Sequence, residues 1–184
     1  MDPQELMRDA QLLFVDGKVK ESIEAFTKAI EAGANPYIAH LSRGVAHVKT
    51  EEVEMALNDF NKAISMNNQS ARAYFFRGMA HMMKNEFENA VSDFTRALEL
   101  KTDYGMAKFS RSVSYARLGN FDESSKDMMA ILPEMEKNLQ SFADSYGIIR
   151  TEMGKVMAQM AGEAAALDLN EKDINTLKKW LEEE

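Results

Sequence analysis

The chain has 184 residues, with 45% apolar and 28% charged side chains, a composition ordinary for a soluble protein. Its 30 acidic and 22 basic residues give a net charge of −8, which argues against binding to nucleic-acid phosphates or to an anionic membrane. It has no cysteine, which excludes disulfides and thiolate chemistry. The polar N-terminus and the lack of a long apolar run predict no signal peptide and no membrane-spanning helix, so we expect a cytoplasmic protein.

A 34-residue repeat runs through the first part of the chain without a gap. Two columns hold small residues, one holds large apolar residues, and a fourth is mostly alanine. Four parallel columns are unlikely to arise by chance. The columns are Ala10, Gly44, Gly78 and Ser112; Ser22, Ala56, Ala90 and Ser124; Phe26, Phe60, Phe94 and Met128; and Ala29, Ala63, Ala97 and Ile131.

Each repeat is predicted to form two amphipathic helices joined by a turn. The first helix carries a small residue, such as Gly44, where two backbones must approach closely. The second helix carries the pattern Ala-x-x-x-Phe-x-x-Ala, which places three residues on one face. The turns are marked by Gly17, Thr50, Asn85 and Gly119-Asn120.

Helix starts are also visible in the sequence. Asp2-Pro3 and Asn35-Pro36 each place a capping residue before a proline at the first helical position. Two other starts are predicted to be capping boxes, in which side chains satisfy free backbone N–H groups. These boxes pair Asn85 with Glu88 and Asn120 with Glu123.

Charged residues follow the same spacing. Arginine recurs in the first helices of the second, third and fourth repeats, and aspartate recurs in the second helices at a fixed 16-residue separation from it. We therefore predict an ion pair between the two helices of each of these repeats, with a structural role. The pairs are Arg43–Asp59, Arg77–Asp93 and Arg111–Asp127.

These columns resemble the tetratricopeptide repeat (TPR) family over residues 3–132. The second and third repeats match best, with Arg-Gly-x-Ala-His in the first helix and Asp-Phe-x-x-Ala in the second. The resemblance implies an all-α, right-handed superhelix of four helix-turn-helix repeats followed by C-terminal helices. The expected repeats are 3–36, 37–70, 71–104 and 105–132, so that residues 1–132 form the repeat domain.

Residues 133–184 form a predicted helical extension. Apolar residues recur in steps of four and three from Met135 to Met160, as on one face of a long helix. A break between 145 and 147 is the alternative, and a last helix is expected from Asn170. The extension is interpreted as a cap over the last repeat. A dimerisation helix and a segment that fills the chain's own groove remain open alternatives.

In the TPR family the first helices line a concave groove, and the resemblance therefore implies where a partner would bind. The lining residues here, on a face expected to be open to solvent, are rich in methionine and phenylalanine, which suit an amphipathic helix or an apolar peptide. We expect an adaptor or scaffold for protein–protein interaction; the alternative is a self-associating assembly protein whose C-terminal helices occupy the groove or dimerise. The predicted partner-binding residues are Met7, Gln11, Leu41, Val45, Arg72, Phe75, Phe76, Met79, Met82, Met83, Met106, Phe109 and Val113.

Other activities are not favoured. Some family members hold the C-terminal carboxylate of chaperones with basic and amide residues, but only Arg72 of the corresponding positions here is suitable; these positions are Met7, Gln11, Ser42, Arg72 and Phe76. The histidines, His40, His47 and His81, are interpreted as packing residues. No phosphate loop, nucleophile motif or metal motif is present, so we expect no enzyme activity, cofactor or metal.

Overall fold

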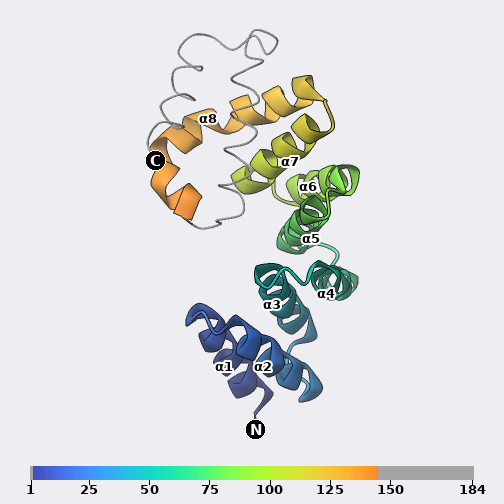
Figure 1. Ribbon diagram of the computed structural model, residues 1–184, viewed down its shortest axis with the longest axis vertical. Coiled ribbons are helices and arrows are strands. Elements are labelled where there is room, and N and C mark those ends of the chain that lie inside the picture. The colour runs from blue at the N-terminus through green and yellow to red at the C-terminus, as the bar shows by residue number, and fades with distance from the viewer. Residues whose placement is uncertain (1, 145–184) are drawn as a thin grey trace. The chain divides into compact units, whose positions relative to one another are not determined.

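The computed structural model describes residues 2–144, and its regular structure within that range is entirely helical (Figure 1). The all-α prediction is therefore confirmed. The helices are α1 (Pro3–Val15), α2 (Val19–Glu31), α3 (Pro36–Lys49), α4 (Val53–Met66), α5 (Ala71–Met83), α6 (Phe87–Leu100), α7 (Gly105–Arg117) and α8 (Phe121–Asp144).

The helices form two compact units, Met1–Tyr104 and Gly105–Glu184. In the first unit, α1 packs against α2, α3 against α4, and α5 against α6, as the repeat predicts. Successive pairs are joined by contacts of α2 with α3 and of α4 with α5. The first helices also approach one another, α1 with α3 and α3 with α5. In the second unit, α7 packs against α8.

The small and large columns of the repeat pack against each other inside each helix pair. A methyl group built on Gly44 would lie 2.6 Å from Cε1 of Phe60, and one built on Gly78 would lie 2.7 Å from Cε1 of Phe94. Both phenylalanine side chains are completely buried. Glycine is thus favoured at these positions of α3 and α5, because the aromatic ring of the second helix takes the space of a side chain.

The turns within the helix pairs share one backbone conformation. Gly17, Glu51, Asn85 and Gly119, which recur at the spacing of the repeat, all have positive φ angles, between 59° and 79°. In each turn, two backbone hydrogen bonds return to the end of the first helix, a Schellman motif. The turn prediction at Thr50 was one position early, because Thr50 caps α3 and Glu51 has the positive φ.

Three first helices begin with a side-chain cap. Asp2, Asn35 and Ser70 each accept a hydrogen bond from a backbone N–H in the first turn, at 3.1, 3.2 and 3.1 Å. The first two were predicted, and the third was missed. The capping box predicted at Asn85 is wrong: that residue has a φ of 59°, and Glu86 precedes α6 without a side-chain cap. The box at Asn120 stays a prediction.

Helix α8 continues beyond the predicted end of the repeat domain. It runs to Asp144, so the boundary at residue 132 falls inside a helix. The predicted break between 145 and 147 and the last helix from Asn170 lie outside the described residues. No helix in residues 2–144 is both long and apolar enough to cross a lipid bilayer.

Candidate functional site

Each predicted arginine–aspartate pair is formed with two hydrogen bonds. Nε of Arg43 lies 2.8 Å from Oδ2 of Asp59, and its Nη2 lies 2.8 Å from Oδ1. The corresponding distances are 2.8 and 2.6 Å for Arg77–Asp93, and 2.6 and 2.7 Å for Arg111–Asp127. The prediction of an ion pair within each of these repeats is confirmed.

The remaining guanidinium nitrogen connects successive repeats. Nη1 of Arg43 donates to Oγ1 of Thr27 on α2 at 2.9 Å, and Nη1 of Arg77 donates to Oδ1 of Asn61 on α4 at 2.8 Å. Arg43 and Arg77 therefore each hold their own second helix and the second helix of the preceding repeat. The sequence contained the signal, a polar side chain as far before the arginine as the aspartate lies after it. Threonine and asparagine hid this signal because they are different residue types.

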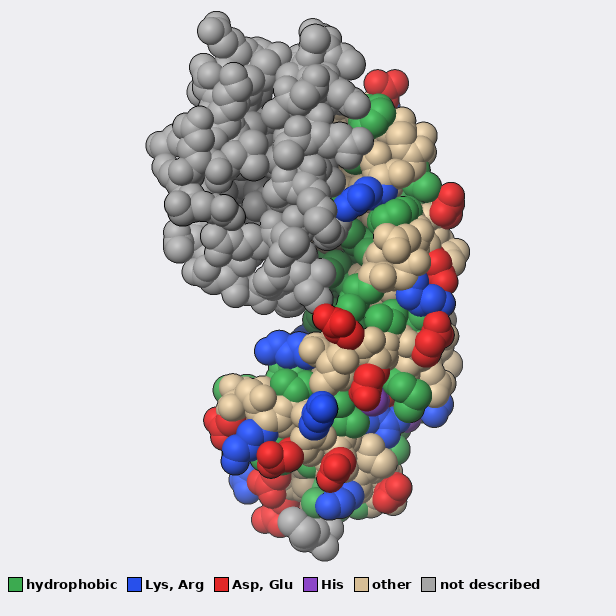
Figure 2. Space-filling model, viewed as in Figure 1, with side chains coloured by type: hydrophobic (Ala, Val, Ile, Leu, Met, Phe, Trp, Pro, Cys, Tyr) green, Lys and Arg blue, Asp and Glu red, His purple; other side chains and the backbone are tan. Residues whose placement is uncertain are grey.

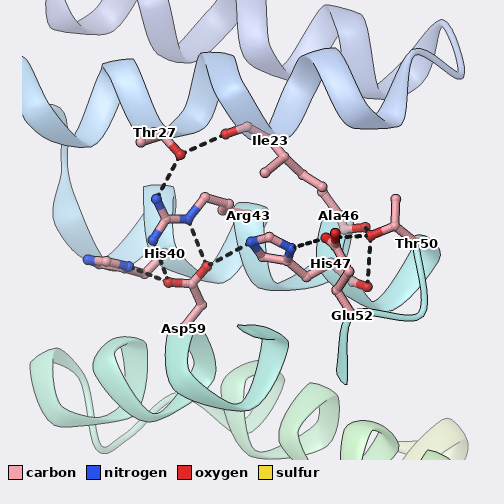
Figure 3. A network of polar contacts seen from close by, with 9 residues as sticks. All are labelled: Ile23, Thr27, His40, Arg43, Ala46, His47, Thr50, Glu52 and Asp59. Atoms are coloured by element: carbon pink, nitrogen blue, oxygen red, sulfur yellow. Dashed lines mark hydrogen bonds and ion pairs between the residues drawn. The ribbon is translucent and has the colours of Figure 1, made fainter. Parts of the chain in front are cut away.

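His40 and His47 belong to the same polar network as Arg43 and Asp59 (Figure 3). Nδ1 of His40 lies 2.8 Å from Oδ1 of Asp59. Nδ1 of His47 lies 2.6 Å from Oε2 of Glu52, while its Nε2 faces Asp59 at 3.9 Å. His81 repeats this arrangement with Glu86 and Asp93. His40 and His47 are buried, as expected of packing side chains, but the ring nitrogens of all three histidines also have specific carboxylate partners.

The network sets the charge state of its carboxylates. Burial opposes ionisation of Asp59, but its hydrogen bonds with Arg43 and His40 outweigh this effect and place the pKa of Asp59 below its usual value. The same bond with Asp59 raises the pKa of Arg43. In the next repeat, hydrogen bonds with Lys84 and then His81 lower the pKa of Glu86 to about 2.

This arrangement is suited to holding helices together. Asp59 is almost fully buried and its two oxygens are occupied by Arg43 and His40. Within residues 2–144, no group of three or more His, Asp or Glu side chains is placed to hold a metal ion.

Half of the predicted partner-binding residues of the first unit are buried. Phe75 is completely buried, and its ring lies 5.4 Å from Phe76, 5.8 Å from Phe94 and 5.0 Å from Tyr104. The expected exposed patch around Phe75, Phe76 and Met79 is wrong as to exposure, because these side chains fill the interior between helices. Met7 and Leu41 are likewise buried.

A smaller apolar surface remains on these helices. Val45, Met82 and Met83 are half-buried, while Gln11 and Arg72 are exposed. Ile38, at the start of α3, keeps 42% of its surface exposed. In the second unit, Phe109 and Val113 are buried and Met106 is half-buried.

Two exposed cations on the first helices lie over aromatic rings. Nζ of Lys49 lies 5.0 Å from the centre of the Phe14 ring, and the guanidinium carbon of Arg72 lies 5.4 Å from the centre of the Phe76 ring. Sequence reasoning singled out Arg72 but not Lys49. The 34-residue register could have found it, since Lys49 shares a column with Met83, a predicted lining residue.

Comparisons with known proteins agree with this architecture. Residues 8–64 and 71–104 match two tetratricopeptide repeat family profiles. A search of curated protein sequences finds no match. Many solved structures are similar, three of which illustrate the range.

The first is MamA, from residue 41 to its end, of Desulfovibrio magneticus, with a TM-score of 0.69 and 18% identity over 76% of this chain and 78% of that chain. The second is a tetratricopeptide repeat protein of Parabacteroides merdae, with a TM-score of 0.68 and 20% identity over 97% of this chain and 70% of that chain. The third is the first TPR domain of Spaghetti (RPAP3), bound to the HSP90 peptide SRMEEVD, with a TM-score of 0.61 and 27% identity over 64% of this chain and 94% of that chain. The 34-residue register, the paired helices and these matches together show that the chain belongs to the tetratricopeptide repeat family.

Proposed function

We propose that the first helices of the repeats bind a partner polypeptide, and that the protein acts as an adaptor or scaffold. The observation that carries this proposal is apolar surface left on helices whose inward sides are already packed. Ile38, Val45 and Met83 retain exposed surface on the same helices that contain the buried Leu41 and Phe76. Covering such a surface with an apolar side chain of a partner is favourable, because it removes apolar area from water.

An amphipathic helix or an apolar extended segment fits this surface. Methionine side chains such as Met82 and Met83 adapt their shape to different apolar partners. Their helix, α5, is already packed against α4 and α6, which lowers the entropy cost of binding. In the second unit, taken by itself, Met106 on α7 is half-buried and is proposed to bind a partner in the same way.

The similarity to the first TPR domain of RPAP3 supports peptide binding in general. That domain is described as bound to an HSP90 peptide. The proposal for this chain does not extend to chaperone tails, because the resemblance places Met7 and Phe76 at two positions of the carboxylate-binding set, and both are buried apolar side chains. We propose instead that apolar contacts provide most of the affinity.

The test is peptide binding to the full chain. A labelled amphipathic helical peptide with leucine anchors is titrated and followed by fluorescence anisotropy. Ile38→Glu combined with Val45→Glu should weaken binding by about tenfold or more, because each change places a charge under an apolar ligand. The matched control is Met55→Glu, which changes an exposed residue of α4 and should leave affinity unchanged.

Two outcomes would contradict the proposal. One is binding that Ile38→Glu with Val45→Glu leaves intact. The other is a stable dimer of the chain, seen by light scattering, that these same substitutions dissociate. That result would assign the surface to self-association rather than to a separate partner.

A further inference from the structure

Charge differs between two first helices of the first unit, α3 and α5, and its second helices. Helices α3 and α5 contain no acidic residue, and their permanently charged residues are Arg43, Lys49, Arg72 and Arg77. By contrast, α2, α4 and α6 each contain two or more acidic residues. On the face seen in Figure 2, acidic and basic side chains of the described residues are interspersed. Although the chain as a whole is acidic, α3 and α5 contain no carboxylate side chain.

Only part of this positive charge is used within the protein. Arg43 and Arg77 are neutralised by their buried aspartates. Lys49 and Arg72 are exposed, and neither forms an ion pair with a residue in the described part of the chain. Each is instead held over an aromatic ring, which limits its motion and keeps the charged end at the apolar surface. Arg8 on α1 is also exposed.

The two acidic residues of α1 lie outside this surface by register. Glu5 shares a column with Ala39 and Ala73, which are completely buried where α3 and α5 contact neighbouring helices. Asp9 shares a column with the arginines that point toward the second helices. The columns that contain Ile38, Leu41, Val45 and Lys49 hold no carboxylate in any repeat.

Resting on the proposed function, we infer that the partner of the first helices is an acidic amphipathic segment. Its apolar side chains cover Ile38 and Val45, and its carboxylates pair with Lys49 and Arg72. The net charge of −8 does not prevent this association, because distant charges are screened beyond about 8 Å at physiological ionic strength. The same two cations disfavour basic partners, so that charge supplies specificity while apolar contact supplies affinity.

Three peptides test the inference with the full chain. They are helical peptides of about 18 residues with the same leucine positions, whose polar faces carry glutamate, glutamine or lysine. At about 50 mM NaCl, the glutamate peptide should bind about three- to tenfold more tightly than the glutamine peptide, and the lysine peptide should bind least tightly. The difference should largely vanish at about 500 mM NaCl.

Matched variants locate the effect. Lys49→Gln with Arg72→Gln should remove the preference for glutamate while leaving the affinity for the glutamine peptide within about twofold. Lys28→Gln with Lys62→Gln makes the same charge change at exposed positions of α2 and α4, and should preserve the preference. Equal binding of all three peptides would overturn the acidic partner but leave the apolar surface in place. Failure of all three to bind would overturn the proposed function as well.

Discussion

Arg43 and Asp59 form a two-bonded ion pair across α3 and α4, with both nitrogen–oxygen distances at 2.8 Å. Asp59 is 1% exposed, so its charge depends on protein partners rather than on water. His40 supplies a third contact at 2.8 Å. At the equivalent Asp93, Arg77 repeats the two hydrogen bonds, but Tyr74 takes the position of His40 and supplies no imidazole.

This difference predicts unequal costs of removing the two aspartates. Asp59→Ala should lower the free energy of unfolding by about 3 to 5 kcal/mol, since it leaves a guanidinium and an imidazole beneath the surface without a carboxylate. Asp93→Ala should cost less, because fewer donors lose their acceptor. Urea unfolding followed by circular dichroism provides the measurement. Equal costs, or costs below about 1 kcal/mol for both, would contradict this account.

The contact between Gly44 and the Phe60 ring gives a second prediction. Gly44→Ala should destabilise the protein by about 1 to 3 kcal/mol, because the new methyl group would overlap a buried ring. In a Phe60→Leu background, which has its own cost, the same substitution should be nearly neutral. Thermal unfolding of the two single variants and the double variant measures the coupling. The same cost in both backgrounds would show that the ring is not the obstacle.

The sequence predicted those features that depend on one helix or on a single repeating pair. The 34-residue columns identified the helix pairs, and the 16-residue spacing identified Arg43–Asp59 and its equivalents. Helical periodicity says which face of α5 is apolar, but not how deeply Phe75 is buried. That depth depends on Phe94 and Tyr104, which approach from elsewhere in the chain. The bond from Arg43 to Thr27 was missed because the equivalent partner of Arg77 is an asparagine, so no single residue type recurs at that position.

The shared turn conformation predicts a stabilising substitution. Glu51 has a φ of 61°, a conformation that costs an ordinary residue about 1 kcal/mol or more, whereas Gly17 occupies the equivalent turn freely. Glu51→Gly should therefore raise the free energy of unfolding by a few tenths to about 1 kcal/mol, after the entropy that glycine adds to the unfolded chain is subtracted.

The control for this turn is Glu24→Gly, which makes the same change at an exposed position inside α2. It should destabilise by about 1 kcal/mol, because glycine is a poor helix former. Opposite signs for the two substitutions in urea unfolding would establish the role of the positive φ. A loss of stability for both would show that Glu51 makes favourable contacts that outweigh its backbone conformation.

The lowered pKa of Asp59 makes its contribution depend on pH in a defined direction. A carboxylate whose pKa is lower in the folded protein stabilises the fold fully above its unfolded pKa, about 3.9, and loses this effect as the pH falls through the folded value. The stability difference between the native protein and Asp59→Asn should thus be largest near neutral pH and shrink below about pH 4.

Other carboxylates titrate in the same range as Asp59, so the difference between the native protein and Asp59→Asn is the quantity to measure. Arg43→Gln removes the main group that lowers the pKa of Asp59, and in that background the difference should be smaller and less dependent on pH. A difference that stays constant from about pH 7 to about pH 2.5 would contradict the assignment of an ionised Asp59 at the centre of the network, because an ionised carboxylate must lose its contribution on protonation.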